Sequence, residues 1–284
     1  MKLRAVVWCI ALLACTAATA GAEDVRKTAE ASMLVTGTVE VNPDGSLHGY
    51  TIDQQDKLPG SVVEVIGKTV PNWHFKLSGA TADVVRSRAS LRLRASPAGD
   101  GNYHVTVVGA SFGEDNHQGG ETVSFKSRAP APRYPQVAIN SRVSGTVYLL
   151  VRIGRDGTVQ DAFAEQVNLE QYARMSEMNM FRKALADASI QAARQWTYNL
   201  PTRGKSVDDP YWVVRVPVQY NLHEIGKPDK ERPYGSWRGY IPGPRQHAPW
   251  VSQTLLSEAP DAIPDDGLHT GNAALQLTTA LGGS

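Results

Sequence analysis

Histidines and glycine-rich segments are the features of this sequence that could carry chemistry. The histidines stand at positions 48, 74, 104, 117, 223, 247 and 269, and no two of them have the i, i+2 or i, i+4 spacing of a metal site. Gly204-Lys205-Ser206 resembles the end of a phosphate-binding loop, but Asn199 stands where such a loop has its first glycine. The sequence also lacks the Gly-x-Ser-x-Gly motif that presents a nucleophilic serine. We therefore predict no catalytic residue, no metal, no cofactor and no enzymatic activity.

Two aspartate-glycine pairs and two tryptophans have structural explanations instead. Asp44 and Asp156 each precede a glycine between apolar stretches, and Asp-Gly favours the tight turn of a β-hairpin because glycine adopts positive φ. Trp73 and Trp196 each end a stretch that is compatible with a helix, where a large ring more often fills a core than binds a ligand. The elements that surround these residues are therefore more informative than the residues alone.

The overall composition excludes several classes of protein. The chain has 284 residues, with 29 lysines and arginines against 28 aspartates and glutamates, and a formal charge of +1. This balance excludes a nucleic-acid partner bound through bulk charge, which requires many contacts between basic side chains and phosphates. Hydrophobic residues make up 42% of the chain, as in globular proteins, and no apolar run reaches the about 20 residues that cross a bilayer. We expect a globular protein without an integral membrane span.

The N-terminus has the pattern of an export signal. Lys2 and Arg4 precede an uncharged apolar run, and small residues up to Ala22 provide cleavage sites. We predict that residues 1–22 are a signal peptide and that the rest of the chain works outside the cytoplasm. An alternative is that Leu12-Leu13-Ala14-Cys15 acts as a bacterial lipobox, in which case Cys15 carries a lipid anchor.

The strongest secondary-structure pattern lies in residues 143–222. Alternating apolar residues predict strands over 147–153 and 212–222, and Asp156-Gly157 predicts a hairpin to a second strand from 158 to about 167. Apolar residues at helical spacing predict an amphipathic helix from 181 to 196. The expected order is strand, strand, helix, strand.

A weaker version of this pattern occurs earlier in the chain. Three motifs recur in the same order, namely 35–39 and 143–147, 44–47 and 156–159, and 73–75 and 196–198. We therefore predict an α+β fold of two small units, each an antiparallel three-stranded sheet with a helix, over residues 32–113 and 127–223. A proline-rich connector, 129–135, joins them. Prolines and glycines without periodicity predict that residues 224–284 form a mostly disordered tail.

The second unit resembles the C-terminal domain of TonB, a periplasmic protein domain of Gram-negative bacteria. The matching features are Tyr134-Pro135 with Ala138, Gly145-Thr146-Val147, Asp156-Gly157, the helix end at 193–198 and the last strand at 214–222. The resemblance implies a three-stranded antiparallel sheet with helices on one face, a periplasmic location and binding of peptides or plugs of outer-membrane proteins. It also implies that Arg133, Tyr134 and Pro135 contact the receptor, and that partners add a strand at the last strand.

The residues of the last strand support edge pairing independently. Pro217 has no N–H to donate, so we expect this strand to lie at a sheet edge. An edge strand can pair with an extended segment of a partner or with a second copy of the chain as a homodimer. We expect Val213, Arg215 and Gln219 to face solvent and to read the partner's side chains. Two structural alternatives stay open: Pro217 protects the edge from aggregation, and Tyr134 packs on the sheet as a rigid lead-in.

The sequence departs from the TonB pattern in its N-terminal half. The apolar segment is too short to span a membrane, and the predicted first unit stands where TonB has a long spacer. Energy transduction by this chain alone is therefore not expected. We predict a periplasmic protein-binding module that recognises an extended segment of an envelope or outer-membrane protein, in connection with TonB-dependent transport. The alternative is an envelope lipoprotein anchored through Cys15 with a structural or assembly role.

Overall fold

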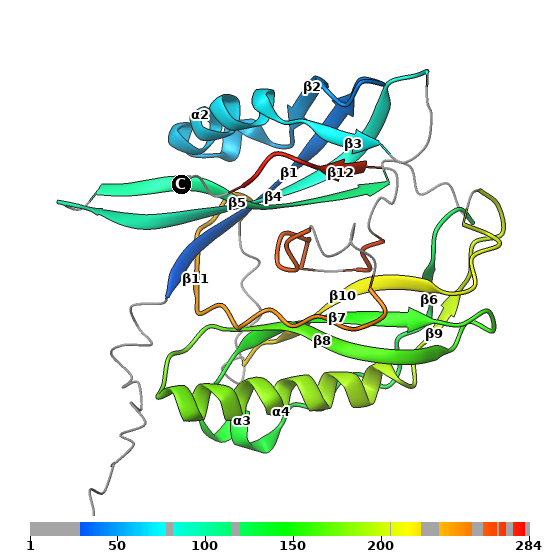
Figure 1. Cartoon of the computed structure of the whole chain (residues 1–284). Coiled ribbons are helices and arrows are strands. Elements are labelled where there is room, and N and C mark those ends of the chain that lie inside the picture. Colours follow the sequence, from blue (N-terminus) through cyan, green and yellow to red (C-terminus); the bar gives the residue numbers. More distant parts are fainter. Residues whose placement is uncertain are drawn as a thin grey trace, which may run out of the picture.

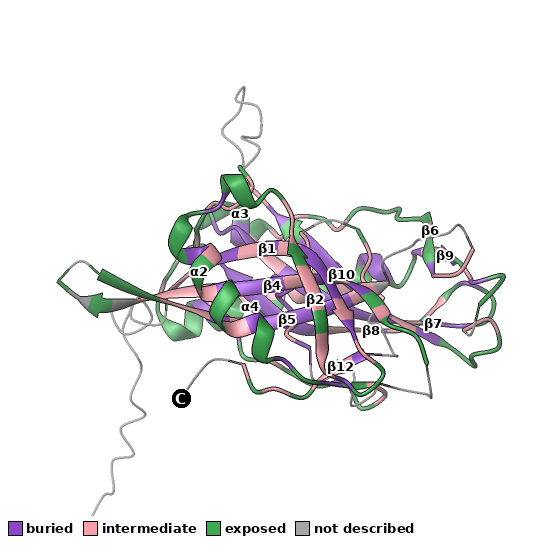
Figure 2. Ribbon diagram, turned by 90° about the horizontal axis from the view of Figure 1, so that it is seen from above, coloured by how far each residue is buried: buried purple, intermediate pink, exposed green. Residues whose placement is uncertain are grey.

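Two larger antiparallel sheets lie face to face, each with a helix on its outer side (Figure 1). The computed structural model describes residues 29–77, 82–100, 102–114, 120–204, 206–222, 233–251, 258–265, 267–270 and 275–281. Segments of the tail, residues 224–284, lie between the sheets, and a view from above shows that the sheets overlap (Figure 2). The predicted α+β class is confirmed. The predicted signal peptide and Cys15 lie outside the described residues.

The second unit, predicted over residues 127–223, occupies residues 124–222 and contains the predicted strand, strand, helix and strand, together with three short elements that were not predicted. Its elements are β6 (Ser124–Ser127), α3 (Gln136–Asn140), β7 (Gly145–Ile153), β8 (Val159–Leu169), α4 (Met175–Ala193), β9 (Thr197–Asn199) and β10 (Trp212–Tyr220). The sheet has the strand order β10-β7-β8, and β9 pairs separately with β6. Helix α4 begins at Met175 rather than at residue 181. Met178 in its first turn is buried, and the backbone N–H of Arg174 donates to the Glu177 carboxylate at 3.0 Å.

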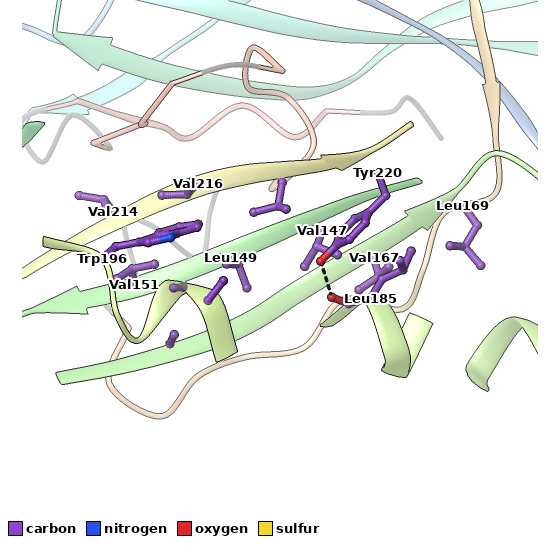
Figure 3. Close-up of a cluster of buried hydrophobic side chains, with 14 of the residues drawn as sticks. Val147, Leu149, Val151, Val167, Leu169, Leu185, Trp196, Val214, Val216 and Tyr220 are labelled. Atoms are coloured by element: carbon purple, nitrogen blue, oxygen red, sulfur yellow. Dashed lines mark hydrogen bonds between the residues drawn. The ribbon is translucent and has the colours of Figure 1, made fainter. Parts of the chain in front are cut away.

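Alternation along the strands places one face of this sheet against α4 (Figure 3). Side chains from the three strands, α4 and the segment that follows it form one buried cluster, which includes Val147, Leu149, Val151, Val167, Leu169, Leu185, Trp196, Val214, Val216 and Tyr220. The Tyr220 hydroxyl donates to the carbonyl oxygen of Leu185 at 3.2 Å, so the polar end of this buried ring is satisfied. The predicted apolar face of residues 212–220 is therefore correct.

The first unit, residues 30–114, uses the same order and adds one strand. Its elements are β1 (Glu30–Val41), β2 (Leu47–Ile52), α2 (Gly60–Thr69), β3 (Phe75–Leu77), β4 (Val85–Gly99) and β5 (Asn102–Glu114), with short 3-10 helices at Gln55–Lys57 and Val70–Asn72. Strand β1 lies between β2 and β4, as β7 lies between β8 and β10. Strand β5 pairs with the outer edge of β4, the edge that corresponds to the outer edge of β10.

The hairpin turns of the two units have the same geometry. The carboxylate of Asp44 accepts the N–H of Ser46 at 2.9 Å, and that of Asp156 accepts the N–H of Thr158 at 3.0 Å. The glycine that follows each aspartate has positive φ, 86° at Gly45 and 75° at Gly157. Each glycine carbonyl then accepts, at 2.8 Å, an N–H from the strand that follows the helix. Turn geometry thus accounts for both Asp-Gly pairs.

The described parts of residues 224–284 are ordered, unlike the mostly disordered tail that the sequence predicts. Strand β11 (Arg238–Tyr240) pairs with β1, and strand β12 (Leu275–Leu277) pairs with β3. Ile241, Ile263 and Leu275 are buried. The prediction failed because these pairings are short and their partners are distant in sequence, so the tail has no local periodicity to detect.

None of the helices in the described part of the chain is long and apolar enough to cross a membrane.

Candidate partner-binding site

Strand β10 lies at the edge of its sheet, where the sequence places Pro217. The backbone N–H of Arg215 donates to the carbonyl oxygen of His269 at 2.8 Å, and the N–H of His269 donates to the carbonyl oxygen of Arg215 at 2.9 Å. These bonds show that the backbone of Arg215 points away from β7. Because outward bonds recur every second residue, position 217 points the same way, and its proline costs the sheet no hydrogen bond.

The tail occupies part of this edge. His269 forms an antiparallel bridge with Arg215, and the Gln219 side chain donates to the carbonyl oxygen of Asp265 at 2.8 Å. Arg128, which precedes the proline-rich connector, donates to the carbonyl oxygen of Pro217 at 2.9 Å. The edge is therefore engaged within the same chain rather than open to solvent.

The prediction that Arg215 faces solvent is wrong. Its side chain is 0% exposed and donates to Glu165 from Nε at 2.8 Å and from Nη2 at 3.3 Å. A third bond, from Nη1 to Glu258, measures 3.1 Å. The side chain leaves β10 on the face opposite α4, and the tail and the first unit cover that face. Gln219 is exposed as predicted, and Val213 is half-buried.

The buried ion pairs join three separate parts of the chain. Glu165 comes from β8, Arg215 from β10, and Glu258 and Arg245 from the tail; Arg245 donates to Glu165 at 2.7 Å. His269 Nε2 lies 3.3 Å from a Glu258 oxygen and 2.7 Å from the hydroxyl of Ser111 on β5. A buried ion pair is stable in a low-dielectric interior only when each charge is balanced by an opposite charge and by hydrogen bonds. The cluster thus fixes the tail to both units.

Counted from the hairpin turns, position 88 in the first unit corresponds to position 215, because Arg88 lies opposite Thr38 on β1 and Arg215 lies opposite Leu150 on β7. Arg88 on β4 bonds Asp53, which directly follows β2, as Arg215 on β10 bonds Glu165 of β8. The Arg88 and Asp53 side chains are 42% and 32% exposed, whereas those of Arg215 and Glu165 are 0% exposed. Only the second of these pairs is sealed from water by the tail.

The electrostatics of Glu258 follow from this environment. Burial alone raises the pKa of its carboxyl, but the hydrogen bond and charge of His269 and the charge of Arg215 lower it, so that the net pKa lies below the usual glutamate value. The ionised carboxylate is therefore the form that the folded chain stabilises.

This lowered pKa predicts a loss of stability in acid. A carboxyl whose pKa is depressed by folding contributes stability that is complete above its unfolded pKa of about 4.3 and disappears as the pH falls through the folded value. We expect the urea midpoint to fall more between about pH 6 and pH 3 in the wild type than in Glu258→Gln, which cannot titrate. Identical pH profiles for the two proteins would contradict the stabilising role of the ionised Glu258.

The segment 133–135, which leads into helix α3, has a packing role in this structure. The Tyr134 hydroxyl donates to the carbonyl oxygen of Val143 at 2.6 Å, and its ring meets that of Tyr220 edge to face, with centroids 5.2 Å apart. Pro135 is the residue that precedes helix α3, and Arg133 is exposed. Tyr134 therefore matches the rigid lead-in alternative, while Arg133 stays available on the surface.

A cavity of about 420 Å³ lies beside the paired segment. Pro217 lines it from the second unit, Arg88 and Ser111 from the first, and Leu268 and His269 from the tail. Within the described residues no group of three or more histidine, cysteine, aspartate or glutamate side chains could hold a metal ion. The arrangement is suited to holding an extended backbone with room for side chains next to it.

Sequence reasoning missed Glu165, Glu258 and His269. Glu165 carries a weak signal. It is a charged residue near the end of β8, where the neighbouring residues are buried on both faces of the strand. Glu258 and His269 have none, because they lie in short segments whose partners are far away in sequence.

The chain has no detectable relative among the proteins compared: no family model, no curated protein and no solved structure matches it.

Proposed function

We propose that this protein is a binding module that captures an extended segment of an envelope protein by adding it to the outer edge of β10. The sequence resemblance to the TonB C-terminal domain and the predicted export signal support the periplasm as the location and an outer-membrane protein as the partner. A binding role, rather than catalysis, fits the absence of catalytic motifs from the sequence.

One observation carries the proposal. Arg215 exchanges two backbone hydrogen bonds, of 2.8 and 2.9 Å, with a residue that belongs to neither sheet, His269. Backbone bonds of this kind are the means by which β-augmentation binds a peptide without regard to most of its sequence. The edge of β10 can therefore accept an extended segment in antiparallel orientation.

The first unit supports the same mode of binding. Its β4 edge, which corresponds to the β10 edge, pairs with β5 along the register from Ser87–Glu114 to Gly99–Asn102. A whole strand thus fits on this type of edge. At β10 the bridge to His269 and the contacts of Arg128 and Gln219 take the place of such a strand, and a partner strand would replace them.

Overlapping synthetic peptides from the periplasmic parts of outer-membrane proteins test this proposal. We expect a binding peptide to shift the backbone amide signals of Val213 to Asn221 in the ¹⁵N spectrum of the full chain. Because strand pairing uses every second residue, N-methylation of one alternating set of peptide residues should abolish binding, and methylation of the other set should preserve it. Binding that tolerates both methylated sets, or that shifts only amides elsewhere, would overturn the proposal.

A further inference from the structure

We infer that the tail segment Glu258–Thr270 is an internal stand-in for the partner, and that the partner which displaces it carries a carboxylate for Arg215. This inference rests on the proposed function and names both the regulation and the chemistry of the same site. The segment supplies the two kinds of contact that a partner would make, backbone bonds at the edge and a charged side chain behind it.

The backbone contacts come from the end of the segment. His269 makes both backbone hydrogen bonds of the bridge to Arg215, and the carbonyl oxygen of Asp265 accepts a hydrogen bond from the Gln219 side chain, so the segment runs beside β10 from position 215 to position 219. An extended partner needs the same outward groups. The tail and the partner are therefore mutually exclusive.

The charged contact comes from the start of the segment. Glu258 is 4% exposed and accepts a hydrogen bond from Arg215 at 3.1 Å. With Glu258 in place, the described cluster has two guanidinium groups, Arg215 and Arg245, and two carboxylates, Glu165 and Glu258. If the segment leaves, the fully buried Arg215 guanidinium loses the Glu258 carboxylate. Removing one partner of a buried ion pair is costly, so a partner that brings its own carboxylate is favoured over a neutral one.

The tail is held on both sides of this segment. Before it, Ile241 exchanges backbone hydrogen bonds of 2.7 and 3.1 Å with Leu169, and after it β12 pairs with β3. A tethered competitor acts at a high effective concentration, typically in the millimolar range for short flexible tethers. The free chain therefore resists weak ligands, and an acidic partner must compete with its own tail.

The probe for this inference is a synthetic peptide with the sequence of residues 258–270, measured by fluorescence anisotropy against full-length proteins. In His269→Pro the tail loses a backbone donor at the edge and the imidazole contacts, so we expect the peptide to bind this variant about tenfold more tightly than the wild type. Glu258→Gln in the full chain, which keeps the side-chain shape, should give a gain in the same direction. No gain in either variant would overturn the inference that the tail occupies the site.

Two controls separate the parts of the inference. Glu64→Gln, the matched control for Glu258→Gln, removes an exposed ion pair with Lys68 on α2, away from β10, and should leave peptide affinity unchanged. A peptide with glutamine in place of Glu258 should bind His269→Pro about tenfold more weakly than the acidic peptide. Equal binding of both peptides would contradict the carboxylate requirement.

Failure of the inference and failure of the proposed function give different results. If the β10 edge is not a binding edge, the acidic peptide shifts no amide of Val213 to Asn221 in any variant. If the edge binds but the tail does not compete, those amides shift equally in the wild type and in His269→Pro.

Discussion

Replacing Arg215 with alanine is expected to lower the free energy of unfolding by about 3–5 kcal/mol. The side chain is fully buried, and its loss leaves the carboxylates of Glu165 and Glu258 in low dielectric with less compensation. Arg245 still bonds Glu165, but the Arg245 side chain is 27% exposed and interacts more strongly with water than the buried Arg215 does. Urea unfolding followed by circular dichroism measures the change.

Arg88→Ala is the matched control, because Arg88 occupies the corresponding position of the first unit. Its pair with Asp53 is partly exposed, and such pairs contribute about 0–1 kcal/mol. A much larger loss at position 215 than at position 88 is the expected result. Equal small losses would show that the cluster is hydrated in solution and that the tail does not seal it.

Replacing Trp196 with alanine is expected to cost about 3–5 kcal/mol, the usual range for truncating a buried tryptophan. The ring is 1% exposed, meets Phe125 edge to face at 5.9 Å, and donates from Nε1 to the carbonyl oxygen of Pro130 at 3.0 Å. Trp73→Ala makes the corresponding change in the first unit, where the ring is also 1% exposed and meets Phe75 and Phe112.

Comparison of the two tryptophan variants tests whether the units unfold together. Since the tail pairs with strands of both units and fills the space between them, we expect one cooperative transition that either variant shifts. Urea unfolding monitored by far-UV circular dichroism, together with loss of dispersed amide signals from each unit, checks this. Two separate transitions would contradict coupling of the units by the tail, if Trp73→Ala shifted only one of them and Trp196→Ala shifted only the other.

Local patterns predicted the sheet of the second unit because its pairings are local or regular. The period of two over residues 212–220 and the Asp-Gly turn at 156–157 are set by neighbouring residues, and both appear in the structure. The early start of α4 was missed: the buried Met178 continues the apolar spacing three residues before Phe181, and the cap formed by Glu177 places the first helical residue at Met175.

The candidate site could be predicted only in part. The edge position of Pro217 follows from its missing N–H, a property of the residue itself. The burial of Arg215 does not, because it depends on a tail residue, Glu258, and on the packing of a second sheet. From the strand pattern alone, an arginine that alternates with apolar residues is expected on the solvent-facing side. The neighbouring sequence gives no indication of the distant residues that cover it.

Amide hydrogen exchange at Arg215 and His269 tests most directly whether the β10 edge is a binding edge occupied by the chain's own tail. In the free wild-type protein both amides should be protected, because each donates to the other residue's carbonyl oxygen. Saturation with the acidic peptide of residues 258–270 should leave Arg215 protected and expose His269. Unprotected amides in the free chain, or protection of both that persists under saturating peptide, would contradict this mechanism.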